Sequence, residues 1–156
     1  MKLTLDQSIA APRDVVFATF REAPRWPQIV SGINAVGGVS GPLEQGDTFT
    51  ETRTMFGREA TETFEVTDLV ADEVLTLTSD SCGVRFVSRH TFEDAGEGRT
   101  KVTLSMATQP LTIVGRLMAP LGVLMAGSMK KLIARDMADF AAECEQAANA
   151  PETHAS

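Results

Sequence analysis

The chain has 156 residues, which is enough for one domain with a sizeable core and too few for two ordinary domains. Hydrophobic residues make up 43% and charged residues 22%, so the composition excludes a disordered chain, a collagen and a coiled coil. Fourteen Lys and Arg against 21 Asp and Glu give a net charge of −7, which would repel phosphate backbones and anionic lipid headgroups. We therefore expect no nucleic-acid partner.

Neither the N-terminus nor the apolar stretches carry a targeting or membrane-spanning signal. Residues 1–12 alternate polar and apolar side chains, which is not the pattern of a signal peptide. The longest apolar stretch, residues 111–129, is interrupted by an arginine, a proline and three glycines. We expect a cytoplasmic protein without integral membrane association. Cys82 and Cys144 form no CxxC pair and are most simply two free thiols.

The first third of the chain predicts one strand and two short helical segments. Residues 2–9 alternate and predict a half-buried strand. Pro12 then suits a first helical turn, and the apolar residues after it recur at helical spacing. Two prolines flank Trp26 and limit that segment to a second helical turn with the indole packed inward. Residues 32–42 are rich in glycine and mark a change to strands and turns.

From Asp47 onward the hydrophobic period is two. Five strands are predicted, at residues 47–55, 58–69, 74–79, 84–93 and 100–108. The breaks between them are short enough for hairpins, so consecutive strands should pair antiparallel as a meander.

A long amphipathic helix is predicted at residues 113–147, lying as a lid over one face of the sheet. Pro120, Gly122 and Gly127 should weaken or kink its first half. Methionines concentrate in that half, and two interpretations stay open: ordinary core packing, or the deformable wall of a ligand cavity. The apolar stripe consists of Met118, Leu121, Met125, Met129, Leu132 and Phe140.

Five segments carry a resemblance to a known family: IAAPRDVVFATF, the Trp-Pro of RWPQIV, EVTDLVADEVLTLTS, RHTFEDAGEGRTKVTLSM and ARDMADFAAECEQ. In this order they resemble the SRPBCC or START-like superfamily, which contains Bet v 1 allergens, lipid-transfer START domains and polyketide cyclase/dehydrase-like proteins. The resemblance covers about residues 3–146, and it indicates the fold more strongly than the function.

The resemblance implies an α+β helix-grip fold. An antiparallel sheet of about seven strands would wrap around the long C-terminal helix, with two short helices after the first strand and a hydrophobic cavity between sheet and helix. We expect a single domain at residues 1–147 and a disordered C-terminal tail at residues 148–156.

The period of two places several polar side chains on the inner face of the sheet. If Phe64 and Phe86 face the core, Glu62 and Ser88 share their faces, and Glu51 and Arg53 join them by the same rule. Burying such groups is costly unless they pair or meet water, so a polar cluster or a wet cavity should lie there. The expected ligand-binding residues are Glu51, Arg53, Glu62, Phe64, Phe86, Ser88, His90, Met106, Met118, Leu121 and Met125.

Arg53 and His90 each have two open interpretations. Arg53 either forms a structural ion pair with Glu51 or Glu62, or anchors a ligand oxygen or carboxylate through its guanidinium group. His90 is either a satisfied, semi-buried histidine or a general acid or base.

The sequence contains no complete nucleophile elbow, phosphate-binding loop or metal-ligand motif. Residues 38–42 lack the final glycine of a nucleophile elbow, and Gly96 and Gly98 belong to a hairpin rather than a phosphate loop. Two His and two Cys far apart give no metal-ligand spacing, and Cys82 has no adjacent base. We expect neither a cofactor nor a metal.

The leading hypothesis is a protein that binds, carries or senses a small hydrophobic, lipid-like or polyketide-like molecule. The alternative is a cyclase/dehydratase-like or hydrolase-like enzyme, with His90 as general acid or base, Arg53 stabilising an oxyanion, and Glu51 or Glu62 orienting the histidine. The chain has no Tyr, whereas the resemblance implies cavity tyrosines in some cyclases. Whether the protein is an enzyme stays open.

A third, weaker hypothesis is a protein-interaction module, which should expose an apolar patch. The sequence predicts no such patch. We expect a monomer or a homodimer, and a dimer could form through an edge strand such as residues 2–9.

Overall fold

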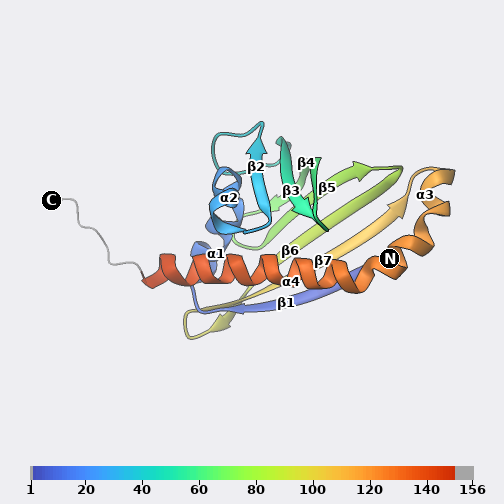
Figure 1. The fold of residues 1–156 in the computed structure, drawn as a ribbon. Coiled ribbons are helices and arrows are strands. Elements are labelled where there is room, and N and C mark those ends of the chain that lie inside the picture. Colours follow the sequence, from blue (N-terminus) through green and yellow to red (C-terminus); the bar gives the residue numbers. More distant parts are fainter. Residues whose placement is uncertain (1, 150–156) are drawn as a thin grey trace.

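A computed structural model describes residues 2–149, in which an antiparallel sheet curves over a long helix (Figure 1). Within these residues the sheet has seven strands in the order β1-β7-β6-β5-β4-β3-β2. The elements are β1 (Lys2–Ile9), α1 (Arg13–Arg21), the 3-10 helix η1 (Ala23–Arg25), α2 (Trp26–Ile29), β2 (Ile33–Gly37), β3 (Thr48–Met55), β4 (Arg58–Val70), β5 (Val74–Ser81), β6 (Val84–Gly96), β7 (Arg99–Pro110), α3 (Ile113–Leu117) and α4 (Ala119–Asn149). This is the expected helix-grip fold.

The meander predicted from the period of two is confirmed for β3 to β7, where each strand pairs antiparallel with the next. Phe56 and Gly57 in the β3–β4 turn have φ of 50° and 78°, and Cys82 and Gly83 in the β5–β6 turn have φ of 51° and 75°. Positive φ at both central residues is the geometry of the tight hairpin turns that match strand twist. Several strands extend a few residues beyond the predicted limits because ladder pairing continues into their polar ends.

The core lies where α1, α2 and the C-terminal half of α4 pack on the sheet. Phe20 of α1 stacks on Phe140 of α4, with ring centroids 4.2 Å apart, and meets Phe92 of β6 edge-on at 5.3 Å. The indole of Trp26 points inward as expected and donates its Nε1–H to the Phe20 carbonyl oxygen at 3.2 Å. These aromatic contacts attach one half of α4 firmly to the sheet.

The predicted C-terminal helix is two helices, which corrects the expectation of one continuous helix over 113–147. The break lies at Met118, and Pro120 occupies the first turn of α4, where its missing N–H needs no partner. Gly122 and Gly127 lie inside α4, which continues to Asn149. Positions 148 and 149 of the predicted tail are therefore helical, and 150–156 lie outside the described residues.

The two halves of α4 differ in what they contact. The C-terminal half buries Ile133, Met137 and Phe140, whereas the first half leaves most of its side chains accessible. In Figure 1, α3 lies at the far end of the sheet from α1 and α2. The first half of α4 is thus not packed down on the sheet, and the space beneath it becomes a cavity. No helix among residues 2–149 is long and apolar enough to cross a bilayer.

Candidate functional site

A cavity of about 680 Å³ lies between the inner face of the sheet and the first half of α4. Its wall is mostly apolar, and every side chain that the sequence placed there lines it. Strand alternation explains this agreement, because β3 to β7 each present every second side chain to the same face. The wall also contains residues that the sequence did not single out, among them Phe20, Trp26, Ser79, Ser81, Asp136 and Met137.

The most polar part of the wall is an ion cluster that joins the sheet to the helix. Arg53 of β3 donates from Nε to Glu51 Oε1 at 2.7 Å and from Nη1 to Asp136 Oδ2 of α4 at 2.9 Å. All three side chains are largely buried. Of the two ion-pair partners considered from sequence, the structure shows Glu51 and adds Asp136.

The carboxylates of this cluster outnumber its guanidinium group. Burial raises the pKa of Glu51, and this effect exceeds the lowering by Arg53, with the nearby charges of Asp136 and Glu62 adding to the rise. Burial likewise raises the pKa of Asp136 in spite of Arg53. The guanidinium expected to hold a ligand carboxylate is already held by two carboxylates of the chain, so a third would meet net negative charge.

Asp136 was missed from sequence although the pattern contained a signal. The helical stripe runs through Met129, Leu132 and Phe140, and position 136 falls on it at the same spacing. An acidic residue on an otherwise apolar stripe must find a partner when the stripe is covered. Its partner, Arg53, comes from a strand 83 residues away in sequence, which periodicity does not reveal.

Strand β5 contributes two hydroxyl groups to the cavity. Ser81 donates from Oγ to Glu62 Oε1 at 3.2 Å, but Ser79 Oγ is buried and has no hydrogen-bond partner among the described residues. Both follow Leu75 and Leu77 at a period of two, and that spacing predicts their inward direction. A buried hydroxyl without a protein partner normally meets water or a ligand, so Ser79 marks a place for a polar atom.

His90 of β6 stands on the same wall, against the ring of Phe20 at a centroid distance of 5.6 Å. Its Nδ1 lies 3.2 Å from the Leu75 carbonyl oxygen, which can only accept, so Nδ1 carries the proton and Nε2 is left as an acceptor. Burial lowers the pKa of His90 to about 4, and this outweighs the opposite effect of the Leu75 hydrogen bond. The imidazole is therefore neutral at pH 7.

The expectation that Glu51 or Glu62 orients His90 is wrong. Glu51 accepts from Arg53 and Glu62 accepts from Ser81, and within residues 2–149 the hydrogen-bond partner of His90 is a backbone carbonyl. The register explains the separation: His90 pairs with Leu75, whereas Glu62 lies at the other end of the sheet, level with Ser81.

A second correction concerns exposed apolar surface, of which the sequence predicted none. Large hydrophobic side chains are exposed throughout α3 and the start of α4. Hydrophobic periodicity indicates which side chains share a helix face, but it does not indicate whether a partner covers that face. The exposed set is Leu111, Ile113, Val114, Leu117, Met118, Leu121, Val123, Leu124 and Met125.

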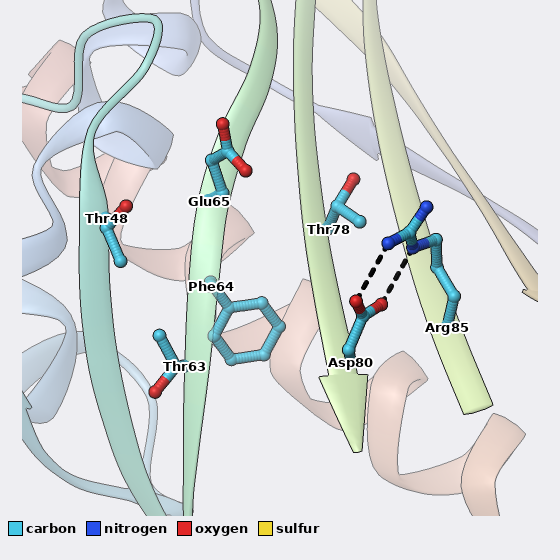
Figure 2. Close-up of a pocket in the computed structure, with 7 residues that line it drawn as sticks. All are labelled: Thr48, Thr63, Phe64, Glu65, Thr78, Asp80 and Arg85. Carbon is cyan, nitrogen blue, oxygen red and sulfur yellow. Dashed lines mark hydrogen bonds and ion pairs between the residues drawn. The ribbon is translucent and has the colours of Figure 1, made fainter. Parts of the chain in front are cut away.

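A smaller hollow of about 260 Å³ lies on the outer face of the sheet, where the side chains of β3 to β6 meet solvent (Figure 2). Its main feature is the ion pair of Arg85 with Asp80, at 2.7 and 2.8 Å, and the hydrogen bond from Arg85 lowers the pKa of Asp80. Such exposed pairing is common on protein surfaces and indicates no site. The lining residues are Thr48, Thr63, Phe64, Glu65, Thr78, Asp80 and Arg85, of which Phe64 also lines the inner cavity.

The two cysteines are free thiols in different surroundings. Cys82 is exposed in the β5–β6 turn at the edge of the cavity, and Cys144 is buried in α4. Burial raises the pKa of Cys144 to about 11, which keeps it protonated.

The fold and the cavity define a helix-grip, SRPBCC-type protein, and comparisons agree. A profile of the family described as polyketide cyclase / dehydrase and lipid transport matches residues 1–145, so the chain belongs to that family. A search of curated proteins found no match.

Solved structures share the architecture at low sequence identity. The Zhui aromatase/cyclase from Streptomyces sp. R1128 superimposes with a TM-score of 0.76 at 16% identity, over 96% of each chain. The ginseng major latex-like protein 151 from Panax ginseng gives 0.70 at 15% identity, over 92% of this chain and 96% of that one. At such identity the likeness shows the fold alone.

Proposed function

We propose that this protein binds, carries or senses a small hydrophobic molecule in the cavity between the sheet and α4. The observation that carries the proposal is the cavity itself, whose volume of about 680 Å³ falls within the range of small-molecule sites. Its wall combines aliphatic, aromatic and methionine side chains with a few polar groups, the composition that favours an apolar ligand with one or two polar atoms.

The polar groups of the wall indicate which ligand they favour. Within residues 2–149 the buried Ser79 Oγ has no hydrogen-bond partner, and Glu62 accepts a hydrogen bond from Ser81. The hydrogen bond of His90 to Leu75 uses Nδ1, which leaves Nε2 as an acceptor. A ligand hydroxyl would satisfy such groups, whereas a ligand carboxylate would add to the excess of negative charge beside Arg53. We infer a neutral, lipid-like or polyketide-like molecule rather than a fatty-acid anion.

The cyclase, dehydratase or hydrolase alternative has less support. A general acid or base works best with a pKa near the working pH, and that of His90 lies near 4 without a carboxylate to raise it. Arg53, the proposed oxyanion stabiliser, already binds two carboxylates. If a substrate is found, unchanged turnover in His90→Ala would remove this alternative.

Ser88→Trp tests the binding proposal directly. Ser88 lies in the middle of the cavity floor, paired with Leu77 and Met106, and an indole there would occupy ligand space. We expect binding of the neutral fluorescent probe N-phenyl-1-naphthylamine to weaken by about tenfold or more, as a loss of roughly 1.4 kcal/mol would produce. A fluorescence titration measures this change.

The matched control is Arg89→Trp on the adjacent position of the same strand. Arg89 is exposed on the outer face and forms an exposed ion pair with Asp68, so probe binding should stay unchanged. Native mass spectrometry of the unmodified protein should also show a bound small molecule or uptake of the probe. A cavity that takes up no apolar molecule in either measurement would contradict the proposal.

A further inference from the structure

The end of the molecule beyond β7 carries an uncovered apolar surface that ligand binding does not require. Five exposed side chains around α3 and the start of α4 point away from the cavity and do not line it. Their exposed fractions reach 76% for Ile113, 74% for Leu117 and 80% for Leu124. We call this surface the apolar tip, and it consists of Leu111, Ile113, Val114, Leu117 and Leu124.

The apolar tip is held in place by the β5–β6 turn. The Leu111 N–H donates to the Gly83 carbonyl oxygen at 2.8 Å, and the Gly115 N–H donates to Thr112 Oγ1 at 3.1 Å as a cap of α3. Gly115 packs so closely on Gly83 that a Cβ at Gly115 would meet the Gly83 backbone. Because α3 is anchored through its buried glycine, its leucine, isoleucine and valine side chains are held outward.

The chain segment that carries the apolar tip has a charge opposite in sign to that of the whole protein. Between Glu97 and Asp136 the chain contains no acidic residue, although it carries 21 acidic residues in all. Lys131 and Arg135 lie seven and eleven positions after Leu124, which places all three on the same face of α4. The basic side chains of α3 and of residues 119–135 of α4 are Arg116, Lys130, Lys131 and Arg135, all exposed.

We propose that the apolar tip docks this protein on the surface of an anionic lipid bilayer. Its aliphatic side chains would enter the interface between headgroups and acyl chains, and the basic side chains beside them would contact lipid phosphates and carboxylates. The repulsion of anionic lipids expected from the net charge of −7 does not apply at this end of the molecule, because charges further away than about 8 Å are largely screened at physiological salt. The local basic face therefore determines the attraction.

The composition of the apolar tip favours a bilayer over a protein partner. Energetically important residues of protein interfaces are enriched in Trp, Tyr and Arg, with Leu and Val under-represented. The tip is built of Leu, Ile and Val. A second copy of the chain is also disfavoured, because two facing tips would bring Arg116 and the lysines of both copies together.

Docking at this place would put the cavity close to the lipid. Met118, Leu121 and Val123 line the cavity and adjoin the apolar tip in sequence. A poorly soluble ligand could then pass between bilayer and cavity without crossing much water. Binding to vesicles is a separate property from ligand binding, so either proposal can fail while the other holds.

Flotation of the full chain with vesicles tests this inference. The protein should float with vesicles of phosphatidylcholine and phosphatidylserine, and much less with phosphatidylcholine alone. Leu117→Ser/Leu124→Ser should reduce the bound fraction about tenfold or more, and Lys130→Gln/Lys131→Gln should do the same while weakening the dependence on salt. Both variants change exposed side chains and should retain the wild-type circular dichroism spectrum.

Val70→Ser is the matched control. Val70 is also an exposed apolar residue, but it lies at the β4–β5 turn, at the opposite end of β5 from the turn that holds α3. This variant should bind vesicles as the wild type does. Failure of the wild type to float, equal loss in Val70→Ser, or self-association that disappears in the tip variants without vesicle binding would each overturn the inference.

Discussion

Lowering the pH from 7 to 4 should reduce the free energy of unfolding by about 3 kcal/mol more in the wild type than in His90→Gln. The folded protein keeps His90 neutral because burial lowers its pKa to about 4, from 6.5. In the unfolded chain the imidazole takes up a proton as the pH falls below 6.5. The stability due to neutral His90 is thus fully present above pH 6.5 and is lost as the pH falls to 4.

The comparison with His90→Gln is needed because Glu51 and Asp136 change the stability with pH in the opposite direction to His90. Their pKa values are raised by burial, so their contribution to stability is greatest at low pH and declines as the pH rises through the raised values. This background is common to both proteins and cancels in the difference. Urea unfolding at pH 7, 6, 5 and 4 measures the two curves. Parallel curves would mean that the cavity is wet enough for His90 to titrate normally.

Arg53→Met should reduce the free energy of unfolding by about 3 kcal/mol or more. Removing one partner of a buried ion cluster leaves the remaining charges uncompensated, and such changes cost roughly 3–5 kcal/mol. Here two largely buried carboxylates, Glu51 and Asp136, would lose their common cation. Urea unfolding at pH 7 measures the loss, and lowering the pH should recover part of it because both carboxylates can then protonate.

Arg85→Met on the outer face is the control for Arg53→Met. Arg85 also pairs with a carboxylate at short distance, as Figure 2 shows, but that pair is exposed to solvent and its removal should leave stability nearly unchanged. The triple variant Glu51→Gln/Arg53→Met/Asp136→Asn should regain much of the stability lost in Arg53→Met, since no charge stays behind. Equal losses in Arg53→Met and Arg85→Met would contradict the assignment of a buried cluster.

The strand order and the inner face of the sheet followed from local pattern. The breaks between β3 and β7 are tight turns or short loops, so each strand could only pair with its neighbours in sequence. Once Phe64 and Phe86 were placed inward, the strict period of two placed Glu62, Ser88 and His90 with them. The pairing of strands that follow one another in the chain depends on local pattern, so it can be predicted from the sequence.

The alternation of inward and outward side chains was less informative at the end of β5. It also did not predict contacts between the sheet and α4. Ser79 and Ser81 continue the inward alternation of β5, but their small side chains gave no hydrophobic signal to follow. Asp136 lies on the apolar stripe of α4, and its ion-pair partner depended on which strand the helix would face. A contact between elements this far apart depends on how rigid surfaces pack, which no local period specifies.

The sequence by itself determined a meander of strands, an amphipathic C-terminal segment and the residues that share the inner face. Only the tertiary structure decided how the helix lies on that face. Phe20, Trp26 and Phe140 hold one half of α4 against the sheet, and because the helix is rigid its first half extends away from the sheet instead of following it. That geometry creates the cavity, brings Asp136 to Arg53 and leaves the apolar tip uncovered.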